Sequence, residues 1–477
     1  MPHTALWTAS EIAAVTQGTL NGDDYNITGI SIDTRHIENG DLFIPLKGPN
    51  FDGHDFIDTA IQNGAAGFLS DRKTVRDAAI LIKDSFTALH DLGAGARARS
   101  HAKIMAVTGS VGKTSVKAML HDAFAAIGVT HASTASLNNH WGVPLSLARM
   151  PRQAEYAVFE IGMNHAGEIT PLSKLVAPHL AIITTVAPAH IAHFDGIESI
   201  ALAKAEIFQG MDVNGVAVLP RDSAQFTILL AEARTQGLQN IVTFGEHEEA
   251  DIRLISCHAH ATHSDVTVAV KGQVYQFTLG LAGYHQALNA LSVIAALDAF
   301  GQWNDTTRAA FAKMQVVKGR GNVITRSAQK GSNGLVIIDD THNASPIAIK
   351  ASLKTLALSQ QSGQRIVALG DMLELGDDAP DLHADLAEAV LACKPDLVLL
   401  AGSLMKYLAN KLPKEMTRHY PDSIALASEV DTLVKDGDII LVKGSHGSRM
   451  DRVVDALSAC PNKDCPYTDE SKTRTSF

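Results

Sequence analysis

Short apolar runs alternate with helical patterns of apolar residues along most of the chain. The run 104–107 is followed by a stretch with two glycines, and then by Val116, Leu120, Phe124 and Ile127 at helical spacing. A continuous apolar run is typical of a strand buried on both faces, as in parallel sheets covered by helices. The pattern therefore predicts an α/β fold, with a strand at 104–107 and an amphipathic helix after it.

The same reasoning predicts further elements on both sides of residue 317. In the middle of the chain we expect strands at 156–161, 180–186 and 215–219, an antiparallel pair at 266–270 and 274–279, and an apolar helix at 285–300. Later we expect strands at 335–338, 366–369, 397–400 and 439–442, alternating with helices. The beginning of the chain mixes short apolar runs with turn-rich pieces, which is typical of a small α/β domain.

The length of 477 residues predicts about three domains, because a single hydrophobic core stops growing beyond about 250 to 300 residues. We expect a small N-terminal α/β domain over 1–101, a central domain with a mostly parallel sheet over 102–316, and a Rossmann-like doubly wound C-terminal domain over 317–460. Residues 461–477 contain almost no aliphatic side chains, so we expect a mobile tail there.

Composition narrows the class of protein. Hydrophobic residues make up 46% and charged residues 19% of the chain, which is ordinary for a globular protein. The formal net charge of -11 has the wrong sign for coating nucleic acid or an anionic membrane. The 4 cysteines are too few for a disulfide framework, and no apolar stretch approaches the ~18 residues of a membrane-spanning helix. We therefore expect a soluble, cytoplasmic protein with free thiols.

The strongest chemical signal is the stretch TGSVGKTS, which lies after the predicted strand at 104–107 and before the helix. It consists of Thr108, Gly109, Ser110, Val111, Gly112, Lys113, Thr114 and Ser115. In a P-loop, backbone N–H groups surround a triphosphate at a helix N-terminus, the lysine reaches the β and γ phosphates, and the next hydroxyl binds Mg²⁺. Val107 stands where the P-loop pattern usually has its first glycine. We expect a P-loop ATPase domain that binds ATP and Mg²⁺ through these residues.

Acidic residues follow two of the predicted strands. Glu160 lies at the end of the strand at 156–161, and Asp339 and Asp340 follow the run 335–338. Ligands of open α/β sheets bind at the carboxyl ends of strands, and Mg²⁺ needs oxygen ligands beyond those of the nucleotide. Because these strand ends belong to different predicted domains, we expect a cleft between the central and C-terminal domains.

The pattern alone leaves the roles of other polar residues open. His190 follows the strand at 180–186, but one histidine among 21 is more often structural or solvated than a metal ligand. Spacing favours an ordinary exposed helical position for Lys204. Asn138 and Asn139 either contact a substrate or cap a helix.

Further strings occur in a fixed order along almost the whole chain. They are SIDTR at 31–35, GDLF at 40–43, DGHDF at 52–56, NN at 138–139, GVP at 142–144, EIGMNH at 160–165, AKAEIF at 203–208, GYHQALN at 283–289, GR at 319–320, DDTHNASP at 339–346, GDMLELG at 370–376 and VKGS at 442–445. With the P-loop, whose early glycine is also absent in that family, they make the chain resemble the Mur ligase family, the ATP-dependent amino-acid ligases of peptidoglycan precursor synthesis. The resemblance implies that the N-terminal domain binds a UDP-sugar.

The resemblance also implies catalytic roles. Lys113 would bind the phosphates of ATP, Thr114 and Glu160 would bind one Mg²⁺, and His190 would bind a second. Lys204 matches a lysine that is carbamylated in the family, a modification that turns its ammonium into an anion able to act on the magnesium shell. The role that the resemblance implies for Lys204 contrasts with the exposed position that its helical spacing favours.

Further binding positions follow from the resemblance. The implied nucleotide contacts outside the P-loop are Asn289, Arg320 and Asp340. The implied substrate contacts are Ser31 and Arg35 for the UDP end, and Asn138, Asn139 and Asn164 for the sugar-peptide side. Three residues depart from the family pattern: His342 replaces a common tyrosine, Ala187 a usual asparagine, and His446 an expected arginine.

Within the family, the chain is most similar to members that join D-alanyl-D-alanine to UDP-N-acetylmuramoyl-tripeptide through an acyl phosphate, and we expect it to act as a monomer.

One alternative is another ligase of the superfamily. A diamino-acid ligase carries a DNPR-type signature, but this chain has NASP at 343–346 in the comparable stretch. A folate ligase lacks the UDP-sugar block that this chain contains. A P-loop regulatory or motor ATPase is the alternative from another class. The third peptide residue is either lysine or meso-diaminopimelate.

Overall fold

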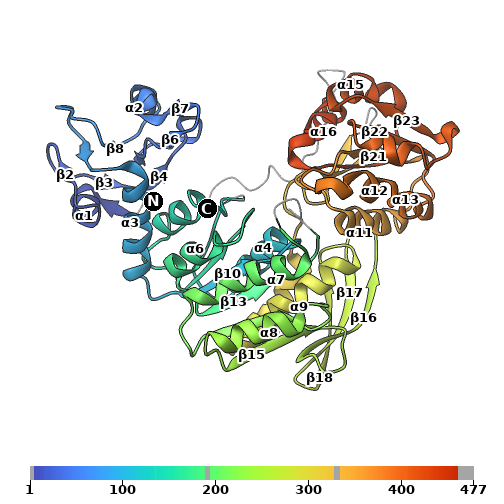
Figure 1. Ribbon diagram of the computed structural model, residues 1–477, viewed down its shortest axis with the longest axis horizontal. Coiled ribbons are helices and arrows are strands. Elements are labelled where there is room, and N and C mark those ends of the chain that lie inside the picture. The colour runs from blue at the N-terminus through green and yellow to red at the C-terminus, as the bar shows by residue number, and fades with distance from the viewer. Residues whose placement is uncertain (1–4, 135, 189–193, 327–333, 460–477) are drawn as a thin grey trace.

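The computed structural model describes residues 5–134, 136–188, 194–326 and 334–459. Three main sheets, each formed by one consecutive stretch of the chain, are covered by helices (Figure 1). In this view the central sheet and its helices lie below and between the N-terminal part, in blue, and the C-terminal part, in orange and red. The predicted α/β class with a mostly parallel central sheet is confirmed. The predicted tail at 461–477 lies outside the described residues.

The N-terminal sheet has the strand order β2-β9-β8-β5-β4 and is parallel except for β2. Its strands are β2 (Thr19–Leu20), β4 (Gly29–Ser31), β5 (Asp41–Phe43), β8 (Gly67–Ser70) and β9 (Ala79–Leu81). Helix α1 (Ala9–Val15) begins with a capping box between Thr8 and Glu11, which satisfies two otherwise unpaired N–H groups. The Asp84 side chain caps α3 (Ser85–Ala98) in a similar way.

Packed helices attach the N-terminal part to the central part. Helix α3 packs against α5 (Gly142–Ala148), and Leu89 of α3 shares a hydrophobic cluster with Leu145 and Ala148 of α5. The Trp7 indole N–H donates a hydrogen bond of 2.8 Å to the Ala148 carbonyl. Leu137 and Trp141, which flank Asn138 and Asn139, pack against the same cluster. The N-terminal part is therefore held against this segment by apolar contacts, and the buried Trp7 N–H is hydrogen-bonded.

The central sheet has the strand order β11-β12-β10-β13-β14-β15-β16-β17-β18. Its strands are β10 (Lys103–Thr108), β11 (Thr130–Ala132), β12 (Tyr156–Glu160), β13 (Leu180–Ile183), β14 (Val216–Pro220), β15 (Asn240–Gly245), β16 (Ile252–Ala259), β17 (Ser264–Val270) and β18 (Gln273–Leu279). Pairing is parallel from β11 to β16 and antiparallel from β16 to β18, as predicted for the last two strands.

Helices cover both faces of the central sheet. One face packs against α4 (Lys113–Ala125) and α9 (Tyr284–Ala299), and the other face packs against α5, α6, α7 and α8. The remaining bounds are α6 (Ile169–Val176), α7 (Ile197–Ala205) and α8 (Phe226–Thr235). In β10, Met105 and Val107 enter the first core whereas Ile104 and Ala106 enter the second. This alternation explains why the strand is apolar at every position.

The C-terminal sheet has the strand order β19-β20-β24-β21-β22-β23, with an antiparallel edge strand β19 and parallel pairing elsewhere. Its strands are β19 (Asn322–Arg326), β20 (Leu335–Asp340), β21 (Arg365–Gly370), β22 (Leu397–Ala401), β23 (Thr417–Tyr420) and β24 (Ile439–Lys443). Its helices include α11 (Pro346–Ala357), α15 (Ser423–Glu429) and α16 (Asp451–Ser458). Two hydrophobic clusters, one on each face, identify it as a doubly wound sheet.

Two parts of the central sheet differ from the sequence expectation. Strand β13 ends at Ile183 rather than at 186, because Thr184 turns its hydroxyl to the P-loop. Strands β11, β15 and β16 were not predicted, since half-exposed positions interrupt or replace their apolar runs. In the described part of the chain, no helix is both long and apolar enough to cross a membrane.

Candidate active site

The P-loop connects β10 to α4 and takes a conformation that requires glycine. Gly109 has φ +148, and a Cβ there would lie 1.9 Å from Thr184 Oγ1. Gly112 has φ +87, and a Cβ there would lie 2.6 Å from Asn289 Oδ1. Backbone conformations of this kind strain any residue with a side chain, and the space is already filled. The two glycines thus let the loop pass close to β13 and α9.

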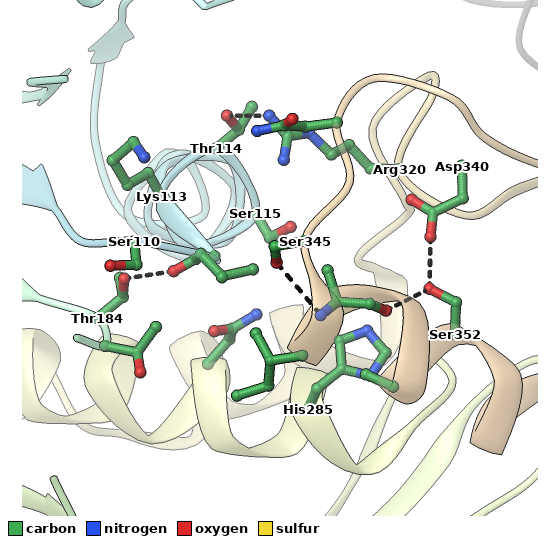
Figure 2. A pocket seen from close by; sticks show the side chains of 18 of the residues that line it. Ser110, Lys113, Thr114, Ser115, Thr184, His285, Arg320, Asp340, Ser345 and Ser352 are labelled. Atoms are coloured by element: carbon green, nitrogen blue, oxygen red, sulfur yellow. Dashed lines mark hydrogen bonds between the residues drawn. The ribbon is translucent and has the colours of Figure 1, made fainter. Parts of the chain in front are cut away.

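Polar contacts fix the loop from the side of β13. The Ser110 hydroxyl donates to the Ala187 carbonyl at 2.8 Å and accepts from the Ala187 N–H at 3.0 Å. The Thr184 hydroxyl donates to the Val111 carbonyl at 2.6 Å, and Figure 2 shows Thr184 directly below the loop. Ser110 therefore holds the loop in shape, a role that the sequence pattern did not predict. Backbone N–H groups of such a loop are the anion-binding element.

Lys113 opens α4 and is folded back over the loop. Its ammonium donates a hydrogen bond of 2.8 Å to the Gly109 carbonyl. Burial lowers the pKa of Lys113, Glu160 opposes that shift, and Arg320 adds to it. A cation held on the loop in this way is stabilised by a nearby anion such as Glu160.

Glu160 ends β12 and is buried, with only 1% of its surface exposed. Its Oε1 accepts a hydrogen bond of 2.8 Å from the Asn138 amide. Its Oε2 lies 3.4 Å from the Lys117 ammonium, yet it has no partner with hydrogen-bond geometry among the described residues. Burial alone would raise the pKa of Glu160, but Lys113 and Lys117 outweigh it and the pKa is lowered. Glu160 is therefore a buried carboxylate anion.

The surroundings of Glu160 fit a magnesium ion. Glu160 Oε2 is a buried carboxylate oxygen with Lys117 at 3.4 Å and no geometrically favourable hydrogen bond from the described residues, and Mg²⁺ favours oxygen ligands of this kind. Thr114, which is 4% exposed, lines the same cavity as Glu160. Both residues were predicted as Mg²⁺ ligands, and their oxygens match the ligand preference of the ion. His190, the third predicted ligand, lies outside the described residues.

Lys204 is buried, so the exposed position favoured by its helical spacing is wrong. It lies in α7 and is only 3% exposed. Burial lowers its pKa well below that of a free lysine, and the charge of Lys113 adds to the effect. The residue spacing identified the helix but not the face that meets the core, because apolar residues are distributed around the whole circumference of α7.

The two adjacent asparagines have different structural roles. Asn138 supports Glu160, whereas Asn139 Oδ1 accepts from the Gly142 N–H at 2.9 Å at the start of α5. Asn164 lines the cavity at the end of β12. Ser31 and Arg35 lie in the N-terminal part, away from this cavity: Ser31 is buried and Arg35 is exposed and paired with Asp33.

The C-terminal part contributes polar groups to the same site. The Arg320 guanidinium donates to the Thr114 hydroxyl at 2.9 Å, as Figure 2 shows. Asp340, at the end of β20, accepts from the Lys443 ammonium at 2.7 Å and from the Ser352 hydroxyl at 2.6 Å. Asn289, predicted as a nucleotide contact, lies beside Gly112. The contact between Arg320 and Thr114 joins the C-terminal part to the central part, whereas the contacts of Asp340 lie within the C-terminal part.

The residues that depart from the family pattern lie in the same region. His342 Nε2 is 2.8 Å from the Ser136 hydroxyl, and the rings of His342 and His446 are 6.2 Å apart. Burial lowers the pKa of His342 to about 4, with Arg320 acting in the same direction. Ala187 is buried against the P-loop. Neutral His342 thus bridges the central and C-terminal parts.

One cavity of about 1170 Å³ extends along the polar residues of the central and C-terminal parts. It is lined by the P-loop, by the strand-end residues Glu160 and Asp340, and by residues of α9 and α11. The expected cleft between the two strand-end acids is therefore present. The sequence pattern gave no signal for Lys117, which lies one helical turn after Lys113, and it assigned no role to Lys443, which ends an apolar strand in the string VKGS.

Comparisons with known proteins agree with this geometry. Family profiles match residues 26–114 as the Mur ligase family catalytic domain, 107–297 as the Mur ligase middle domain, and 319–446 as the Mur ligase glutamate ligase domain. A curated Bacillus subtilis protein named UDP-N-acetylmuramoyl-tripeptide--D-alanyl-D-alanine ligase is 33% identical, with 95% of this chain and 99% of the relative covered. The chain belongs to the Mur ligase family.

Solved Mur ligases have the same arrangement. The crystal structure of MurF from Acinetobacter baumannii has a TM-score of 0.82 and 28% identity, with 96% of this chain and 99% of that chain covered. The MurF ligase from Thermotoga maritima, solved in complex with ADP, has a TM-score of 0.74 and 27% identity, with 90% of this chain and 96% of that chain covered. As a Mur ligase, the protein is an ATP-dependent ligase, so a regulatory ATPase without ligation is excluded.

Proposed function

We propose that the protein joins the amine of D-alanyl-D-alanine to the free carboxylate of UDP-N-acetylmuramoyl-tripeptide at the expense of ATP. The observation that carries this proposal is the cavity shared by the P-loop, Glu160 and Asp340. Its volume of about 1170 Å³ exceeds the ~300 to 1,000 Å³ of ordinary small-molecule pockets. It therefore has room for a nucleotide and for the reacting end of a second substrate. The names of its close relatives support the same substrates.

The reaction consists of two displacements. First, an oxygen of the substrate carboxylate attacks the γ phosphorus of ATP, the bond to the bridging oxygen breaks, and ADP leaves with that electron pair. The product is an acyl phosphate. Second, the neutral amine of the dipeptide attacks the acyl carbon, the bond to the phosphate oxygen breaks, and inorganic phosphate leaves. The amine proton passes to phosphate or water. Positioning of the two anions is the main task of the protein in the first step.

The cations of the site make this approach of two anions feasible. Lys113 is placed to move from the Gly109 carbonyl to the γ phosphate, and Arg320 reaches the same end of α4 from the C-terminal part. Thr114 and Glu160 would hold Mg²⁺, which when bound neutralises phosphate charge. Fixed positive groups in a buried site stabilise charge that moves in the transition state, because water does not screen them.

The three parts of the chain hold different parts of the substrates. We place the UDP end on Ser31 and Arg35, which do not line the ATP cavity and so suit the portion remote from the reaction. We place the sugar-peptide side near Asn138, Asn139 and Asn164. The amine substrate enters from the C-terminal part, whose approach over the P-loop excludes water from the acyl phosphate.

We also propose that Lys204 is carbamylated. Burial lowers the pKa of Lys204 well below that of a free lysine and so favours the neutral amine, which is the form that adds to carbon dioxide. Its nitrogen forms a bond to the carbon of CO₂, one proton is released, and a carbamate anion results. This anion would lie in the buried, positively charged region around Lys113, where a negative group is stabilised.

Replacing Lys204 by alanine is expected to lower the ligation rate by at least about 100-fold, because a preorganised charge next to the phosphates is lost. Measured kcat should fall much more than KM for UDP-N-acetylmuramoyl-tripeptide rises. A matched control is Lys174→Ala, which removes a lysine near the end of α6 on the same face of the central sheet. Mass spectrometry of the intact protein should show a CO₂ adduct that Lys204→Ala lacks. An unchanged kcat in Lys204→Ala would contradict this role.

The test of the proposed function is a coupled assay of phosphate release. Release is expected only when UDP-N-acetylmuramoyl-tripeptide, D-alanyl-D-alanine, ATP and Mg²⁺ are all present. Tripeptides with lysine and with meso-diaminopimelate are compared, which identifies the third residue. Turnover with UDP-N-acetylmuramoyl-dipeptide and a diamino acid, or with a folate and glutamate, would instead favour another ligase of the superfamily. Phosphate release that does not depend on the UDP-peptide or on the amine substrate would overturn the proposal.

We propose that the protein acts as a monomer in the cytoplasm. A single chain supplies the P-loop, the acidic strand ends and the C-terminal cations of the cavity, so a partner is not needed to complete the site. The described cysteines, Cys257 and Cys393, are free thiols, which suits a reducing compartment. Light scattering of the purified chain measures its mass directly.

A further inference from the structure

A second group of polar side chains lies at the tip of the hairpin formed by β16 and β17. Figure 1 shows these strands side by side at the outer edge of the central sheet. His258 of β16 pairs with Asp265 of β17, and both side chains are exposed. The His260 N–H donates to the His263 carbonyl at 2.8 Å, which closes a tight turn over 261–262. The turn therefore brings His260, His263 and Asp265 together.

Metal-ligating atoms of these three side chains lie within 4.8 Å of one another. The rings of His260 and His263 are nearly parallel, with centroids 4.4 Å apart and an interplanar angle of 18°. His260 Nε2 lies 3.1 Å from Asp265 Oδ2.

Neighbouring hydroxyl groups contact two further polar atoms of the cluster. Thr278 Oγ1 donates to Asp265 Oδ1 at 2.9 Å, and Thr262 Oγ1 lies 3.2 Å from His263 Nδ1. These contacts do not involve His263 Nε2, whereas Asp265 Oδ2 faces His260 Nε2, so a bound ion would replace that contact. Supporting hydrogen bonds of this kind orient the ligands of protein metal sites.

We propose that His260, His263 and Asp265 bind a divalent transition-metal ion of the Zn²⁺ class. Two imidazoles and one carboxylate match the ligand set of Zn²⁺, with water in the fourth position, whereas Mg²⁺ prefers oxygen ligands alone. Tetrahedral bonds of about 2.0 to 2.1 Å place ligand atoms about 3.3 Å apart. Rotation of the side chains closes that distance, because His260 and Asp265 are 48% and 54% exposed.

The site is separate from the magnesium ligands but borders the same cavity. Ala261 and Thr262, which form the turn between the proposed ligands, line the cavity together with the P-loop and α11. A bound ion would connect the two strands at this rim and so fix the position of Thr262. The inference does not depend on the identity of the substrates of ligation.

The test is calorimetric titration of the full-length chain with ZnCl₂, after removal of metals and in excess MgCl₂, so that the nucleotide site is occupied by Mg²⁺. Saturable binding of one equivalent is expected. His260→Ala and His263→Ala should each weaken the affinity by at least about tenfold. The matched control is His101→Ala, which removes an exposed histidine elsewhere in the chain and should leave the affinity unchanged.

A spectroscopic measurement distinguishes a lost site from a damaged protein. Co²⁺ bound to the unaltered chain should give visible absorption bands typical of nitrogen and oxygen ligands, and these bands should be absent in His263→Ala. Circular dichroism should show that both variants keep their fold. Absence of saturable Zn²⁺ binding by the unaltered chain would overturn the proposal. Affinity retained by both histidine variants would overturn it as well, because the ion would then bind elsewhere.

Discussion

Replacing Lys113 by alanine is expected to reduce ligation by at least about 1000-fold, which corresponds to about 4 kcal/mol of transition-state stabilisation. Lys113 is the first residue of α4, and its ammonium lies on the P-loop, which we propose surrounds the phosphates. Without this cation, the substrate carboxylate approaches an uncompensated γ phosphate, and the two anions repel each other. The measurement is phosphate release with saturating substrates, compared with the unaltered chain.

The matched control for this prediction is Lys103→Ala. Lys103 is exposed at the opposite end of β10, so its loss changes the net charge equally without affecting the phosphate site. Both variants should unfold at nearly the same temperature as the unaltered chain. This is expected because the Lys113 pKa is lowered by burial, which means that the ammonium is not a strong source of stability. Near-normal ligation by Lys113→Ala would refute the role of the P-loop.

Glu160→Gln is expected to produce the second large effect, a fall in kcat of at least about 100-fold together with a higher Mg²⁺ requirement. Glutamine keeps the size of the side chain and an oxygen for the Asn138 amide, but it removes the negative charge. The ion then loses an anionic ligand, and Lys113 and Lys117 lose their common counter-charge. The measurement is the ligation rate as a function of free Mg²⁺ concentration.

Glu155→Gln is the matched control for Glu160→Gln, because it removes the same charge at the other end of the same segment. Glu155 is exposed immediately before β12, at the end of the strand opposite to Glu160, and its substitution should leave the Mg²⁺ dependence unchanged. If Glu160→Gln shows the same Mg²⁺ dependence as the unaltered chain, Glu160 is not a magnesium ligand. The alternative would then be that it only neutralises the two lysines, which a fall in kcat without a shift in Mg²⁺ dependence would reveal.

The features that sequence predicted best are local. Thr108 to Ser115 form one continuous stretch, and the strand before it and the helix after it are recognisable from apolar spacing over short distances. Glu160 and Asp340 could be placed because each ends an apolar strand, and the ends of parallel strands meet at one edge of a sheet. Family resemblance added residues whose surroundings no pattern indicated, such as Lys204 and Arg320.

The features that sequence missed depend on contacts between distant segments. Lys117 was overlooked because a lysine in an amphipathic helix usually points to solvent, whereas here it lies 3.4 Å from Glu160. The histidine cluster at the β16–β17 hairpin was overlooked because β16 itself was not predicted. The register between β16 and β17 decides which of their side chains lie opposite each other. A shift by one residue would separate His258 from Asp265.

The sequence by itself determined the type of each domain and the position of the phosphate-binding loop, since strand burial, helical spacing and glycine content are properties of neighbouring residues. Only the tertiary structure decided that Lys204 is buried, that Asn138 supports Glu160, and that Arg320 reaches Thr114 from the C-terminal part. Those outcomes follow from how sheets and helices pack together. The charge and burial of a side chain depend on its neighbours in space, most of which are remote along the chain.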